Sequence, residues 1–116
     1  MSPLDLTVTG ITVAANAAIA AADLARARFV LANSAEVGVP PSWLPGLAAL
    51  KAAGAAGLLL GLLGHRSLGI TAGLGLVLFF TGAVVAHLRA RVHHNMAFPL
   101  AFLGLAVAST ALAVTR

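Results

Sequence analysis

The chain contains no cysteine, and only 9% of its 116 residues are charged. The absence of cysteine excludes disulfides, thiol catalysis and cysteine-ligated metal. The shortage of charge excludes a water-exposed surface on all sides, because soluble domains carry roughly 25% charged residues. Hydrophobic residues make up 60% of the chain and the mean hydropathy is +1.02, so we expect lipid to be its main solvent.

The net charge of +4 does not indicate nucleic-acid binding. The seven basic residues are scattered, mostly near expected helix ends, and aromatic residues make up only 5% of the chain. Basic helix ends that meet anionic lipid headgroups explain this charge more simply. The expected partner is therefore the lipid bilayer, and no nucleic-acid partner is expected. The first residues lack the basic leader of a secretory signal peptide.

Four segments are long and apolar enough to span a membrane, which takes about 20 residues as a helix. With their expected extensions the helices occupy residues 6–31, 44–63, 68–90 and 96–114. The first span itself ends near Leu24, and we expect its helix to continue toward Leu31. Short links force neighbouring helices to run antiparallel. The sequence therefore predicts an all-α, up-down four-helix transmembrane bundle in a single domain, residues 1–116.

Prolines and glycines mark the boundaries of these helices. Pro40 and Pro41 require a turn, after which Ser42 is expected to cap the second helix and Trp43 to anchor it at the membrane interface. The second and third helices are rich in glycine, which lets helix backbones approach closely in lipid. These glycines pack the bundle internally or form the interface of a homo-oligomer, for which we expect a dimer or trimer.

Basic residues in the links give an expected orientation. Arg26, Arg28, Arg89 and Arg91 lie on one side, whereas Arg66 and Arg116 lie on the other side with the termini. Basic residues favour the cytoplasmic side. The sequence thus predicts a multi-pass protein of the inner (plasma) membrane whose termini are outside.

Lys51 is the only lysine in the chain, and it lies within the second apolar segment. A charge inside a spanning helix costs at least ~2.5 kcal/mol and is kept only when it faces a partner or a polar cavity. Up-down geometry brings Asn16, Asp23, Lys51 and His87 to the same end of the bundle. We therefore expect these four residues to line one polar cleft.

The residues of this end suggest two roles. Asp23 and His87 are candidate general acid and base groups. The candidate substrate-binding residues are Asn16, Arg26, Lys51, Arg89 and Asn95.

Each of these residues also has a simpler interpretation. The ammonium group of Lys51 can extend to the headgroups or merely neutralise Asp23. Asp23 can instead pair with Arg26, three residues later on the same helix. His87 can be an ordinary interfacial histidine, a proton donor or acceptor, or an axial haem ligand.

His93 and His94 are a weak candidate for a metal site. Adjacent residues on a helix point about 100° apart, and no carboxylate lies near them in the sequence. The sequence therefore predicts no metal site.

The chain resembles the DoxX-like family of small bacterial four-helix membrane proteins, in the form common in actinobacteria. The resemblance covers residues 22–108 and rests on three stretches: ARARFVLANSAEVGVPPSWLP (25–45), LKAAGAAG (50–57) and GAVVAHLR (82–89). Namesakes of the family are associated with a thiosulfate:quinone oxidoreductase and, in mycobacteria, with a membrane complex that handles oxidative stress. Since this chain has no cysteine for a thiol relay, the resemblance implies a quinone-site or anchoring subunit with a redox enzyme as partner.

Three functions are consistent with these features. The first is a membrane subunit that binds a quinone, lipid or isoprenoid molecule near Lys51. The second is a small intramembrane enzyme acting on an apolar substrate such as an epoxide, by fold-level analogy with styrene oxide isomerase, a four-helix membrane enzyme that uses haem. The third is a structural protein whose polar residues only anchor it. Haem and quinone are the candidate cofactors.

Overall fold

The computed structural model describes residues 2–116, and all their regular structure is helical. Its elements are α1 (Pro3–Leu24), α2 (Arg28–Glu36), a single 3₁₀ turn η1 (Pro41–Trp43), α3 (Leu44–Leu62), α4 (Arg66–Arg89) and α5 (Ala97–Thr115). Within the described residues, α1, α3 (together with η1), α4 and α5 are each long and apolar enough to cross a membrane. The prediction of an all-α membrane bundle is confirmed.

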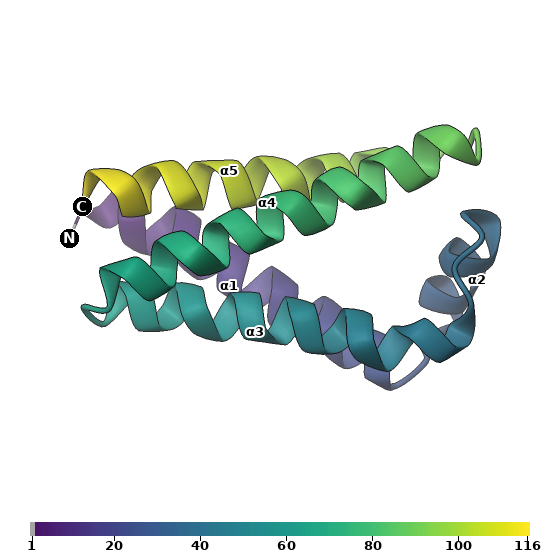
Figure 1. The fold of residues 1–116 in the computed structure, drawn as a ribbon, viewed down its shortest axis with the longest axis horizontal. Helices are drawn as coiled ribbons and strands as arrows, with labels where there is room; N and C mark the ends of the chain where they lie inside the picture. Colours follow the sequence, from purple (N-terminus) through teal and green to yellow (C-terminus); the bar gives the residue numbers. More distant parts are fainter. Residues whose placement is uncertain (1) are drawn as a thin grey trace.

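The four long helices form an antiparallel bundle in which each helix contacts two others (Figure 1). Helix α1 packs against α3 and α5, and α4 packs against the same two helices from the other side. The two termini lie at one end of the bundle, and α2 lies at the opposite end. This arrangement puts the end of α1, the start of α3, the end of α4 and the start of α5 at the end that carries α2.

The predicted continuation of the first helix toward residue 31 is wrong. Helix α1 ends at Leu24, and Arg26 adopts a left-handed conformation with φ of +53°. The amide of Ala27 donates to the carbonyl of Ala22 at 3.1 Å, and that of Arg26 donates to Asp23 at 3.1 Å. These two bonds form a Schellman motif, which satisfies the last carbonyl groups of the helix and turns the chain away. The following residues form the separate helix α2 across the end of the bundle.

The start of α3 also differs from the expectation. Ser42 lies inside the 3₁₀ turn and makes no capping hydrogen bond to α3, which begins at Leu44 with Pro45 in its first turn. Proline is compatible with the first turn because the amide groups there have no partner within the helix. Trp43 is 58% exposed, as expected for a residue at the membrane interface.

Glycines allow α3 and α4 to approach each other inside the bundle. A Cβ atom on Gly61 would lie 2.7 Å from the Cα of Gly69, a distance that real Cβ atoms do not show. Further along, a Cβ on Gly54 would overlap the side chain of Leu76, which belongs to the buried core with Leu58, Phe80 and Ala106. These glycines therefore serve packing within one chain, the first of the two interpretations given above.

Candidate functional site

A cleft of about 630 Å³ opens at the end of the bundle that carries α2. Its wall is mostly apolar and includes six aromatic side chains: Phe29, Trp43, Phe79, Phe80, Phe98 and Phe102. Its polar lining consists of Asp23, Asn33, Ser34, Lys51, His87 and Asn95. A volume of this size, with apolar walls and a few polar groups, is typical of a small-molecule site.

The structure brings Lys51 and Asp23 together in this cleft. The Lys51 Nζ lies 2.7 Å from the Asp23 Oδ2, and the two residues are only 9% and 2% exposed. The Lys51 ammonium group also lies 5.4 Å from the centre of the Phe79 ring, within the range of a cation–π contact. Lys51 thus faces the interior and does not extend to the headgroups.

The alternative ion pair between Asp23 and Arg26 does not form. Asp23 occupies the inward face of α1, whereas Arg26 follows the end of that helix and is exposed. The left-handed turn at Arg26 removes the helical geometry that an i, i+3 pair requires.

His87 belongs to a small hydrogen-bond network that joins three elements. Its Nδ1 lies 2.8 Å from the carbonyl oxygen of Ala83, and its Nε2 lies 3.2 Å from the Oδ1 of Asn33 on α2. The same Asn33 oxygen accepts a hydrogen bond from the Nδ2 of Asn95 at 2.5 Å. His87 is buried, with an exposed fraction of 4%. The network fixes α2 against the end of α4 and the link that precedes α5.

The partners of His87 permit two protonation states. The Ala83 carbonyl can only accept, so Nδ1 carries a proton. Nε2 either carries a second proton and donates to the Asn33 oxygen, or it accepts from the Asn33 amide when the Asn33 and Asn95 side chains rotate together. Both ring nitrogens already have partners, so axial ligation of haem would require His87 to leave this network.

Glu36 and His94 make a second contact between α2 and the link before α5. The His94 Nε2 lies 2.5 Å from the Glu36 Oε2, but the side chains are 66% and 41% exposed. Exposed pairs of this kind contribute little, about 0–1 kcal/mol. The contact therefore adds less to the position of α2 than the buried Asn33 network does.

The other predicted site residues lie outside the cleft lining. Asn16 is fully buried in the bundle, where its Nδ2 donates to the carbonyl of Thr12 at 3.0 Å. Arg26 and Arg89 are exposed near the end that carries α2. Within residues 2–116, no group of three His, Asp or Glu side chains is close enough to hold a metal ion.

Sequence reasoning missed Asn33, because the first helix was expected to continue toward Leu31 and not to turn back after Leu24. Asn33 gains its position only when α2 folds back over the bundle. The available signal was its place within the stretch 25–45, which carried part of the family resemblance.

The profile of the family described as the DoxX-like family matches residues 7–109. This range contains α3 and α4 whole, most of α1 and α5, and every polar residue of the cleft. No curated protein and no solved structure shows significant similarity to the chain.

Proposed function

Because the chain belongs to the DoxX-like family and is a multi-pass membrane protein, we propose that it binds a lipid-soluble small molecule in the cleft. The molecule is of the quinone, lipid or isoprenoid type, with a polar head and an apolar body. The polar head lies near Lys51, Asp23 and His87, and the apolar body lies against the aromatic wall.

The distribution of polar groups in the cleft carries this proposal. A buried ion pair and a buried imidazole occur in a cleft whose remaining wall is mostly apolar. In lipid such groups are costly, and they typically mark a substrate or ion site. Lys51 can donate to a carbonyl or hydroxyl oxygen of the ligand while it remains paired with Asp23, because an ammonium group has three donors.

The aromatic wall supports the same function. Phe98 and Phe102 are stacked with ring centres 5.8 Å apart, and Phe80 lies 5.1 Å from Phe102. Phe29 of α2 lies 6.3 Å from Phe98 and extends this surface to the mouth of the cleft. A flat ring or an isoprenoid chain would pack against such a surface.

A small intramembrane enzyme is the second candidate function. Its support is that a carboxylate, Asp23, and an imidazole, His87, both line the cleft. Asp23 or His87 would act as acid or base on an apolar substrate such as an epoxide, in an isomerase or hydrolase reaction. Turnover of an epoxide that survives both Asp23→Asn and His87→Ala would exclude this candidate.

The setting of the protein follows from its arginines and from its family. The four-to-two distribution of arginines between the two ends supports a plasma-membrane protein with its termini outside. The family supports a role as a subunit beside a redox enzyme, and the exposed apolar helix faces are available for a dimer or trimer.

Trp43 provides a direct test of ligand binding, since it is the only tryptophan and it lines the cleft. Ubiquinone-1 would be titrated into the protein in mild detergent while Trp43 fluorescence is recorded, with a fatty alcohol and farnesol as competitors. We expect saturable quenching that weakens at least tenfold in His87→Ala and is unchanged in His65→Ala, an exposed histidine at the other end. A saturable change of Trp43 fluorescence with the fatty alcohol or farnesol, but not with ubiquinone-1, would assign the lipid or isoprenoid class. A linear, non-saturable response to all three molecules would contradict the proposal.

A further inference from the structure

The inward face of α1 is polar along almost its whole length. Within the described residues of this helix, the buried positions are Asp5, Thr9, Thr12, Asn16, Ala20 and Asp23. They recur every three or four residues and therefore form one stripe along the helix. In a membrane bundle such a stripe either holds helices together by hydrogen bonds or faces a polar pathway.

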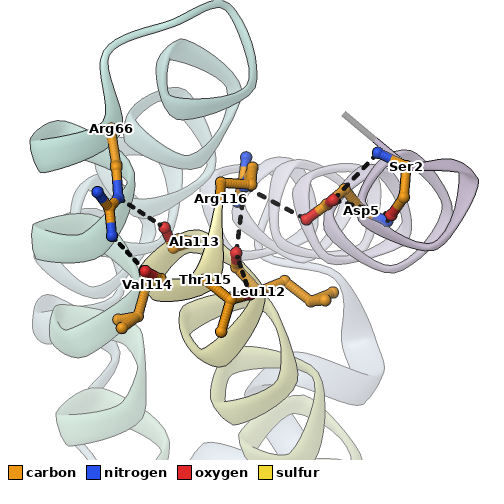
Figure 2. Close-up of polar contacts among 8 residues, drawn as sticks. All are labelled: Ser2, Asp5, Arg66, Leu112, Ala113, Val114, Thr115 and Arg116. Carbon is orange, nitrogen blue, oxygen red and sulfur yellow. Dashed lines mark hydrogen bonds and ion pairs between the residues drawn. The ribbon is translucent and has the colours of Figure 1, made fainter.

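A cavity lies at each end of the stripe. Asp23 lines the cleft described above. At the other end a hollow of about 380 Å³ is lined by Asp5, Arg66 and Arg116, among others. Figure 2 shows this end: Arg116 approaches Asp5, with 3.3 Å between Nε and Oδ1, while Arg66 donates to the carbonyl groups of Ala113 and Val114.

Two polar atoms between the cavities have no hydrogen-bond partner among residues 2–116, whereas the Thr12 hydroxyl already donates to the carbonyl of Val8 at 2.8 Å. The hydroxyl groups of Thr12 and Ser109 lie 2.8 Å apart across the interface of α1 and α5. On either side of this pair, Thr9 Oγ1 and Asn16 Oδ1 are buried and have no hydrogen-bond partner among residues 2–116. Buried polar atoms of this kind are normally satisfied by internal water.

The spacing of the groups suits a chain of such waters. At about 1.5 Å per residue, Asp5 and Asp23 are about 27 Å apart along the axis, close to the ~30 Å thickness of the hydrocarbon layer. Successive members from Asp5 to Asn16 are about 4.5–6 Å apart along the axis. The last interval, from Asn16 to Asp23, is about 10.5 Å along the axis, and the only buried position of α1 within it is Ala20. The cleft lining includes Ile19 in this interval.

We propose that this face of α1 is a proton pathway that connects the hollow at Asp5 with the cleft at Asp23. Threonine and serine hydroxyl groups both donate and accept, so each can take a proton from the water on one side and release its own proton to the water on the other side. The hydroxyl groups then rotate back before the next transfer, and Thr12 turns its hydroxyl away from the Val8 carbonyl to take part. Asn16 orients water between Thr12 and the cleft, and the carboxylates of Asp5 and Asp23 lie at the two ends of the stripe. The pathway would deliver protons to the cleft from the opposite membrane face.

A structural role predicts different behaviour. Hydrogen bonds between helices, such as that of Thr12 with Ser109, also hold membrane bundles together. In that case variants of the stripe would change stability and leave the permeability of the membrane to protons unchanged. Proton flux is therefore the readout that separates the two roles.

The test uses liposomes that contain the whole chain and the trapped pH dye pyranine. A potassium gradient with valinomycin imposes a membrane potential, and the initial rate of internal pH change is measured. We expect wild-type protein to raise this rate at least tenfold over protein-free liposomes, and Asn16→Leu and Thr12→Val to remove most of the increase. Thr71→Val is the matched control, because Thr71 is exposed on α4 and bonds only to its own helix.

Several outcomes would overturn the proposal. The proposal fails if liposomes with wild-type protein take up protons no faster than protein-free liposomes. It also fails if Asn16→Leu and the wild type give equal rates of internal pH change. If a variant fails to elute as a single species, Thr12→Ser provides a second comparison, since it keeps the hydroxyl and should keep the flux. Quenching of Trp43 by ubiquinone-1 in Thr12→Val tests the ligand site separately, because Thr12 lies outside the cleft lining.

Discussion

The ammonium nitrogen of Lys51 lies 2.7 Å from a carboxylate oxygen of Asp23, and this pair joins α3 to α1 inside the bundle. Each residue alone would carry an uncompensated charge in a space with little water. The two residues therefore act as one electrostatic unit. The contribution of their interaction to the free energy of unfolding is seen only when one partner is removed.

Removal of one partner should destabilise the bundle strongly. We expect Asp23→Asn or Lys51→Met to lower the free energy of unfolding by about 3–5 kcal/mol, because each leaves a buried charge unpaired. Simultaneous replacement, Asp23→Leu with Lys51→Met, should cost much less or stabilise the protein. Unfolding in mixed detergent and SDS, followed by circular dichroism, measures these differences. Additive losses in the double variant would contradict the coupling of the two residues.

The hydrogen bonds of Asn33 should hold α2 over the cleft. Asn33→Ala removes the partner of both His87 and Asn95, and we expect amide hydrogens of α2 to exchange about fivefold faster for each bond worth ~1 kcal/mol. Hydrogen–deuterium exchange with mass spectrometry measures this rate. Glu36→Gln is the control, since it weakens only the exposed contact with His94 and should change the exchange little. Equal effects of the two variants would contradict the leading role of Asn33.

The close approach of α3 and α4 at Gly61 should tolerate no side chain. Gly61→Ala places a methyl group against the backbone at Gly69, and we expect a loss of about 1–3 kcal/mol in unfolding free energy. Gly75→Ala on α4 is the control, because a Cβ there meets nothing within 4 Å, and its higher helix propensity should make it neutral or stabilising. A stable Gly61→Ala variant would contradict the observed packing.

The left-handed position at the end of α1 should be more stable with glycine than with arginine. Arg26→Gly removes the steric cost of φ at +53°, and we expect a gain of about 0.5–1 kcal/mol in unfolding free energy. Arg28→Gly, inside the first turn of α2, should instead lose about 1 kcal/mol of helix propensity. Thermal unfolding in detergent measures the stability of the two variants, Arg26→Gly and Arg28→Gly, against the wild type. A loss in Arg26→Gly would show that the arginine side chain itself stabilises this end.

The long-range features of the fold were predictable because they follow from composition. Four apolar segments with short polar links leave few alternatives to an antiparallel bundle, and a lone lysine in an apolar helix must find a partner. The pairing of Lys51 with Asp23 was one of three interpretations of Lys51. The choice among them depended on how deep both residues lie in the bundle, and this depth is set by helix packing.

The features that were missed depend on local backbone geometry. Arginine rarely occupies a left-handed position, so nothing in the sequence around Arg26 indicated the end of α1. Because that turn was missed, the network of Asn33 was missed as well. The role of Asn16 was assigned to the cleft from its helix face alone, but the cleft lining reaches along α1 only to Ile19.

Native mass spectrometry of the protein purified from its own membranes in mild detergent tests the central proposal, a ligand in the cleft, most directly. We predict a retained, stoichiometric mass in the range of a quinone, lipid or isoprenoid, which is lost in His87→Ala and kept in His65→Ala. A wild-type protein that carries no retained mass after mild extraction, or a mass equally retained in both variants, would contradict binding at this cleft.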